Sequence, residues 1–242
     1  MWPDRNEGEG NSLRDTGAAV LAQHLSALVC LTLLELRSCM IGDAGICDLA
    51  SSLHTVSSLR ALNVENNLFG AEGLRGLAQG LPCCPTLRTL ALALQDQGMV
   101  ADELRSFQGA AALAQVFGAC WHLSEMCLRL LGFDIPEQCL PVVFSALGHI
   151  TALKRLEMVC DNWKFPRQSF NGLSELTRLV GLEQLCLGYM WIRPDLQCGE
   201  SRGTDWEQVL VACTHLTRLE FNSLSHGAED AGNVLHVIGR MV

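Results

Sequence analysis

The cysteines and histidines of this sequence are the side chains with the chemistry for catalysis or metal binding. There are twelve cysteines and seven histidines. Thiolates act as nucleophiles and, like imidazoles, as zinc ligands. Their spacing supports neither role, because there is no C-x-x-C, Cys83 and Cys84 are adjacent, and the histidines are scattered. No glycine-rich phosphate loop, G-x-S-x-G or H-E-x-x-H is present. The sequence therefore predicts no enzyme activity, no metal site and no cofactor.

Arginine and glutamate alternate with apolar residues in several short segments, and their chemistry suits protein recognition. Leu34 and Leu36 are two residues apart, so in an extended strand they point to one face while Glu35 and Arg37 point to the other. Arginine can form paired contacts with carboxylates, and Tyr189 adds an aromatic candidate. The candidate protein-binding residues are Glu35, Arg37, Asn63, Glu65, Glu125, Arg129, Arg155, Glu157, Tyr189, Arg218, Glu220 and Asn222. The alternative is a solvated face whose cross-strand charges satisfy one another.

A repeated pattern between Leu31 and Leu81 positions these residues. Its first copy returns 28 residues later with the same kinds of residue in the same places. Each copy begins L-x-x-L-x-L, which predicts a strand, and continues with apolar residues at i, i+3, i+4 and i+7, which predicts a helix. In the first copy these helical residues are Ile46, Leu49, Ala50 and Leu53.

Two polar positions complete the repeat. Cys39 in the first copy and Asn67 in the second stand where the chain leaves the strand, and their side chains can hydrogen-bond backbone groups in that turn. Asp43 stands where an N-cap of the following helix is expected. One strand and one helix cannot bury their apolar faces alone, so we expect the copies to stack.

The template extends over most of the chain. Residues 1–10 form a polar segment without a clear cap, and residues 11–242 form a repeat domain of about seven full repeats plus a partial first one. Insertions interrupt it at residues 97–109 and 193–203, and a less regular helix is expected around Leu173, Leu176 and Val180. Neither end carries a closing element. We therefore expect the chain to be a piece of a longer array or an incomplete gene product, and to self-associate through its uncapped ends.

Composition limits the functional classes. The net charge of −9 argues against a nucleic-acid binder, which would show a basic stripe. The uncharged stretch from Thr16 to Leu34 hints at a membrane span, but the repeat divides it into one helix and the next strand. Most cysteines stand in or beside small core or turn positions, which indicates free thiols in a reducing compartment. We therefore expect a cytoplasmic protein that does not bind membranes.

Residues Leu31 to Leu81 resemble the 28-residue repeats of the ribonuclease-inhibitor-like subclass of leucine-rich repeats. Those repeats occur in ribonuclease inhibitors, the Ran GTPase-activating protein and NOD-like receptor sensor domains. The resemblance implies an α/β leucine-rich repeat solenoid, a curved horseshoe with parallel strands on the concave face and helices on the convex face. It also implies a non-enzymatic protein-protein interaction module that binds an unidentified protein partner on the concave face, as part of a larger receptor or scaffold. The alternative is a regulator of a small GTPase, of the GTPase-activating type.

Overall fold

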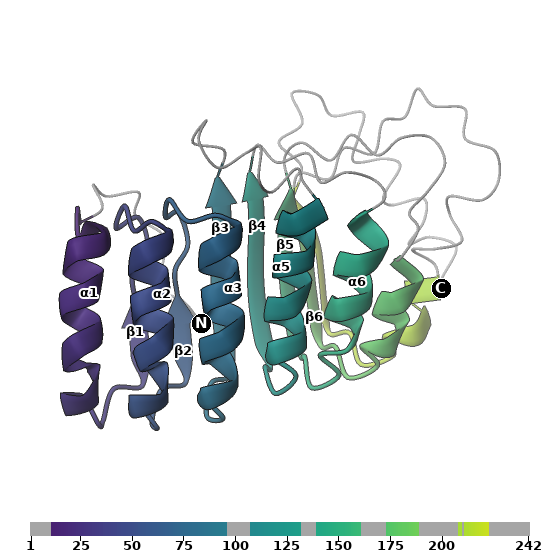
Figure 1. The fold of residues 1–242 in the computed structure, drawn as a ribbon. Coiled ribbons are helices and arrows are strands. Elements are labelled where there is room, and N and C mark those ends of the chain that lie inside the picture. The colour runs from purple at the N-terminus through teal and green to yellow at the C-terminus, as the bar shows by residue number, and fades with distance from the viewer. Residues whose placement is uncertain are drawn as a thin grey trace.

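The computed structural model describes residues 11–95, 107–131, 139–160, 173–188, 208–209 and 211–222. Its helices form one layer and its strands a second layer behind them (Figure 1). The strands make a single parallel sheet in the order β1-β2-β3-β4-β5-β6-β7, so each strand lies beside the one that follows it in sequence. This is the topology that a stacked strand-helix repeat predicts.

The strands and helices alternate along the chain. The strands are β1 (Leu33–Glu35), β2 (Ala61–Asn63), β3 (Thr89–Gln95), β4 (Glu125–Leu131), β5 (Arg155–Cys160), β6 (Gln184–Gly188) and β7 (Arg218–Asn222). The α-helices are α1 (Arg14–His24), α2 (Asp43–Ser52), α3 (Ala71–Gly80), α5 (Phe107–Ala119) and α6 (Leu140–Gly148). Short 3-10 helices are η1 (Leu25–Ala27), η2 (Leu53–Thr55), η3 (Leu81–Cys83) and η5 (Leu173–Arg178).

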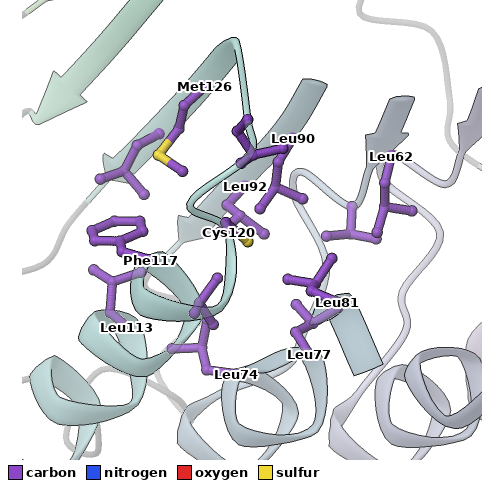
Figure 2. Close-up of a cluster of buried hydrophobic side chains, with 14 of the residues drawn as sticks. Leu62, Leu74, Leu77, Leu81, Leu90, Leu92, Leu113, Phe117, Cys120 and Met126 are labelled. Carbon is purple, nitrogen blue, oxygen red and sulfur yellow. The ribbon is translucent and has the colours of Figure 1, made fainter. Parts of the chain in front are cut away.

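The core lies between the helices and the sheet, and it is made by the apolar positions of the repeat. Leu62 of β2, Leu90 of β3 and Leu77 of α3 are buried in one cluster with their counterparts from neighbouring repeats (Figure 2). Gly80 permits close helix packing, because a Cβ atom there would lie 2.2 Å from the carbonyl oxygen of Ala50. The 28-residue period therefore predicts the core correctly.

The turn position of the repeat joins neighbouring repeats through Asn67. Its Nδ2 donates to the carbonyl oxygens of Leu36, at 2.7 Å, and Val64, at 3.0 Å. Its Oδ1 accepts hydrogen bonds from the backbone N–H groups of Cys39 and Ile41, each at 3.1 Å. The prediction that this position hydrogen-bonds backbone groups of the turn is confirmed, and the bonds extend into the preceding repeat.

One local expectation was wrong, and a second is confirmed in part. Asp43 does not cap the helix that it begins, since the N-cap of α2 is Gly42 and no side chain caps it from that position. The Asp43 carboxylate instead accepts hydrogen bonds from the next repeat, at Gly70 and Gly73. The helix expected around Leu173, Leu176 and Val180 is the 3-10 helix η5, and Val180 follows it with an exposed side chain. The insertion at residues 193–203 lies outside the described residues, and the one at residues 97–109 lies largely outside them.

Candidate functional site

The sheet face turned away from the helices, here called the concave face, is built from strand positions that alternate with the buried leucines. Strand pairing places equivalent positions side by side. The central row contains Glu35, Asn63, Ala91, Cys127, Glu157, Cys186 and Glu220. The row nearer the start of the strands contains Leu33, Ala61, Thr89, Glu125, Arg155, Gln184 and Arg218.

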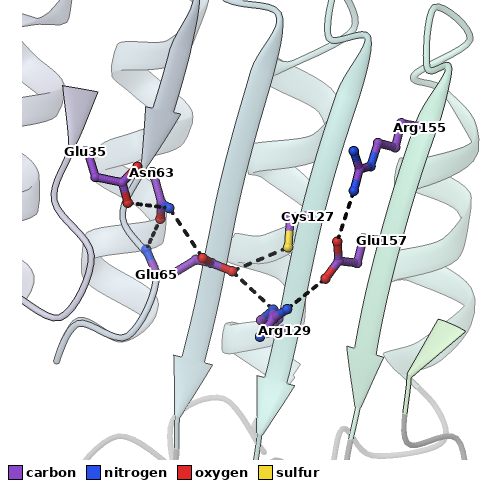
Figure 3. A network of polar contacts seen from close by, with 7 residues as sticks. All are labelled: Glu35, Asn63, Glu65, Cys127, Arg129, Arg155 and Glu157. Atoms are coloured by element: carbon purple, nitrogen blue, oxygen red, sulfur yellow. Dashed lines mark hydrogen bonds and ion pairs between the residues drawn. The ribbon is translucent and has the colours of Figure 1, made fainter. Parts of the chain in front are cut away.

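A charge network crosses β3 in the middle of this face (Figure 3). Arg129 Nε lies 3.3 Å from Glu65 Oε1, although Glu65 follows β2 and Arg129 belongs to β4. The strand between them contributes Ala91 and Ala93, both fully buried. Because alanine has only a methyl side chain, the longer side chains from either side can meet above it. The two alanines therefore make the contact between Glu65 and Arg129 possible.

Further contacts hold both ends of this pair. Arg129 Nη2 donates to Glu157 Oε1 at 2.8 Å. Cys127 Sγ donates to Glu65 Oε1 at 3.4 Å. Glu157 Oε2 lies 3.6 Å from Arg155 Nη2, which continues the chain of charges onto β5. Alternating charges along this chain stabilise carboxylates that would be costly to bury alone.

The network continues to the first strand through Asn63, which is buried. Asn63 Nδ2 donates to Glu35 Oε1 at 2.7 Å and to Glu65 Oε2 at 3.4 Å. Asn63 Oδ1 accepts a hydrogen bond from the backbone N–H of Glu65 at 2.9 Å. Burial, followed by the charge of Glu65, raises the pKa of Glu35, and Arg37 opposes this shift. The folded protein therefore disfavours the charged form of Glu35.

The candidate residues divide into a buried part and an exposed part. Asn63 and Glu65 are buried, and the side chains of Arg129 and Glu157 are largely covered. Glu35 is exposed as a residue, although its carboxylate is part-buried where it meets Asn63, while Arg37 and Glu125 are half-buried.

Accessible charges of the set also lie on β5 and β7. The side chain of Arg155 is 34% exposed and that of Arg218 is 52% exposed. Arg218 Nε donates to Glu220 Oε1 at 2.7 Å. Tyr189 lies outside the described residues, and of Asn222 only the backbone, at the end of β7, is described.

Sequence reasoning did not place Cys127 and Cys186 on this face. β4 continues to Leu131, so the alternation of inward and outward positions includes Cys127, and β6 includes Cys186 in the same way. A longer alternation of Met126, Leu128 and Leu130 in the sequence was the available signal. Burial, followed by the charges of Glu157 and Glu220, raises the pKa of Cys186 to about 11. Its thiol is therefore protonated near pH 7 and is a poor nucleophile.

The described residues contain neither a metal-binding group nor a membrane-spanning helix. Among them there is no group of three or more His, Cys, Asp or Glu side chains arranged to hold a metal ion. No helix in this part of the chain has the length and apolar character needed to cross a membrane. The arrangement offers charged and amide groups for noncovalent contacts.

Comparison with known proteins agrees with this architecture. Residues 57–78 match the family model described as "Leucine Rich repeat". The fold is a leucine-rich repeat solenoid. The matched segment contains β2 and most of α3, which is one strand-helix unit of the solenoid. No curated protein matches the chain.

Three chains found in a comparison with solved structures share little sequence with this one. Actin-binding site 2 of leiomodin-1 is 14% identical, with a TM-score of 0.46, covering 60% of this chain and 79% of that one. The tropomodulin C-terminal domain from Caenorhabditis elegans is 9% identical, with a TM-score of 0.43 and coverages of 82% and 92%. An internalin from Listeria monocytogenes is 16% identical, with a TM-score of 0.24 and coverages of 84% and 70%.

Proposed function

We propose that this solenoid is a non-enzymatic protein-protein interaction module that binds a protein partner on its concave face. The observation that carries the proposal is the row of Arg155, Gln184 and Arg218 on three adjacent strands. Adjacent strands are about 4.8 Å apart, so this row spans about 10 Å. Arginine is among the residues that most often dominate binding energy. The row could therefore form the centre of an interface.

The buried network supports this function by fixing the exposed charges. Arg155 contacts Glu157, and Arg129 holds Glu157 from the other side. A side chain that is already ordered loses less conformational entropy when a partner binds. We infer that Glu65, Arg129 and Glu157 position the surface, whereas Arg155, Arg218 and Glu220 contact the partner.

The test is affinity capture from cell extract, followed by affinity measurement with the purified partner. We expect Arg155→Ala and Arg218→Ala each to weaken binding by at least 1 kcal/mol, about fivefold, without changing the melting temperature by more than a few degrees. The matched controls are Ser52→Ala and Gln79→Ala on α2 and α3, which should leave affinity unchanged. If the helix-side controls abolish binding and the arginine variants do not, the surface assignment is wrong.

The same capture experiment distinguishes simple binding from the alternative function, regulation of a small GTPase. If the captured partner is a small GTPase and its rate of GTP hydrolysis rises when the solenoid is added, the protein is a GTPase regulator. If the rate is unchanged, binding alone is its role.

A further inference from the structure

The edge of the sheet where the strands begin carries a basic row distinct from the concave face. Backbone hydrogen bonds align the residues of this row, which immediately precede the strands. The N–H of Arg88 donates to the carbonyl of Arg60 at 2.7 Å, that of Ser124 to Arg88 at 2.9 Å, and that of Lys154 to Ser124 at 2.8 Å. Arg60, Arg88 and Lys154 are exposed, so three cationic side chains project from four consecutive repeats.

An exposed tryptophan lies next to this basic row. Trp121 is in the turn that leads into β4, and the residue is 69% exposed. Its ring meets the ring of His122 edge to face, with centroids 5.4 Å apart. Burial lowers the pKa of His122; a hydrogen bond with the backbone of Cys84 opposes this shift, and the charge of Arg88 adds to it. Trp121 thus packs against His122, and Pro85, exposed in the corresponding turn of the previous repeat, extends the apolar surface.

The charges of this row are little neutralised by the protein itself. Arg88 Nη1 donates to the carbonyl oxygens of Pro85 and Leu87 and not to a carboxylate. Within the described residues, Arg60 takes part in no ion pair. Lys154 pairs with Glu183 at 2.8 Å, but its side chain is 62% exposed, and pairs of this kind contribute little. The row is therefore a local excess of positive charge on a chain whose net charge is −9.

We propose that Arg60, Arg88, Trp121 and Lys154, here called the edge surface, bind an extended acidic segment of another protein. The four residues belong to consecutive repeats in the order cation, cation, aromatic, cation. Three strand spacings amount to about 14 Å, which is the length of four to five extended residues. The segment that fits has acidic residues on either side of one large apolar residue, which packs on Trp121.

A peptide suits this surface better than nucleic acid or an anionic membrane. A polyanion or a charged bilayer extends well beyond three cations and would meet the acidic remainder of the molecule. A short acidic segment fits within the basic row. This site is independent of the concave face, because it uses none of the residues assigned to that interface.

The test uses fluorescence polarisation with a labelled peptide, Gly-Asp-Glu-Leu-Asp-Glu-Gly, and the full chain. We expect saturable binding that weakens as salt rises, and Arg60→Gln combined with Arg88→Gln should weaken it about fivefold or more. Trp121→Ala should weaken binding similarly, and Trp121→Phe should restore most of it. Arg75→Gln on α3 is the matched control, since it removes one positive charge from the helix layer and should have little effect.

Several outcomes would overturn the proposal. The proposal is wrong if the peptide does not bind, or if an analogue with Asn and Gln in place of Asp and Glu binds equally well. It is also wrong if Arg75→Gln weakens binding as much as the Arg60 and Arg88 variant does. Tighter binding of single-stranded DNA or phosphatidylserine vesicles, lost in the Arg60 and Arg88 variant, would assign the surface to those partners instead. Melting curves of each variant show whether a loss of peptide binding comes from unfolding. If Trp121→Ala unfolds the protein, binding by the conservative Trp121→Phe variant decides the outcome.

Discussion

Asp43 accepts a hydrogen bond from the backbone N–H of Gly73 at 2.6 Å, although the two residues belong to different repeats. The same Oδ1 atom accepts the N–H of Gly70, the N-cap residue of α3, at 2.8 Å. One carboxylate of α2 thus satisfies two backbone donors at the start of the next helix. Asp15 makes the corresponding bond to Gly42 at 2.6 Å. Helix capping in this solenoid therefore passes from each of these helices to the next.

Replacing Asp43 by alanine should destabilise the protein by about 0.5–2 kcal/mol, the usual cost of removing a helix cap. The loss arises at α3 and not at α2, because the unsatisfied N–H groups belong to α3. Urea unfolding measures the free energy, and hydrogen exchange locates the loosened helix. Asp48→Ala, at an exposed position of α2, is the control and should cost much less. Faster exchange confined to α2 would contradict the capping assignment.

The strands and helices of each repeat could be predicted from the sequence of that repeat. The polar contacts between residues of different repeats could not. Leu62 and Leu90 are buried because each strand carries its own apolar period, which can be read locally. The partner of Asp43 cannot be read in this way, because it lies in the next repeat. The contact between Glu65 and Arg129 could not be predicted from one repeat either. It depends on the small side chains of Ala91 and Ala93 on the strand between them.

Leu62→Ala should reduce the free energy of unfolding by about 2–5 kcal/mol through lost burial and the cavity that remains. Leu62 is buried in β2 and pairs with Leu34 and Leu90 on the flanking strands. Because each repeat contacts mainly its neighbours, hydrogen exchange should accelerate first in β1 and β3. Uniform acceleration across the sheet, or none, would contradict a solenoid organisation.

The cysteines should react with Ellman's reagent in two groups. The ten cysteines whose side chains the structure describes form no disulfide, and Cys30 and Cys83 are exposed. Burial raises the pKa of Cys84 to about 11 and that of Cys120 to about 12. At pH 8 the two exposed thiols should react rapidly and the two buried thiols slowly, because the thiolate is the reactive form.

The same reagent tests the prediction of free thiols over the whole chain. Denatured protein that has not been reduced should titrate as twelve thiols. A reducing agent should leave the melting temperature unchanged. Blocked cysteines in the denatured protein would show that disulfides form.

Because the pKa of Glu35 is raised, Glu35→Gln should stabilise the protein by an amount that depends on pH. Below the pKa of the unfolded chain, this carboxyl is protonated in both states and has no effect on stability. As pH rises through its folded pKa, the folded state must also ionise it, and stability falls. Glu35→Gln should therefore raise the urea midpoint at pH 7 more than at pH 3.5, because glutamine can still accept the hydrogen bond from Asn63. An equal effect at both pH values would show that the charge is not responsible.

Arg129 should matter more for stability than the exposed arginines, because its removal leaves Glu65 buried without a cation. Breaking a buried pair by deleting one partner typically costs about 3–5 kcal/mol, and we expect a value near the lower end. Glu65 retains hydrogen bonds from Asn63 and Cys127 after the change, which offset part of the loss. Arg129→Met is the variant to measure, because methionine fills much of the space above Ala91 and Ala93.

A double-mutant cycle with Glu65→Gln isolates the contribution of the pair itself. If the network is structural, Glu65→Gln should recover part of the stability lost in Arg129→Met, since it removes the uncompensated charge. Arg218→Met, the exposed control on β7, should cost no more than about 1 kcal/mol. Additive effects of Arg129→Met and Glu65→Gln would show that the two side chains do not stabilise one another across β3. Arg155 would then lack the ordered support that the proposed function assigns to Glu65 and Arg129.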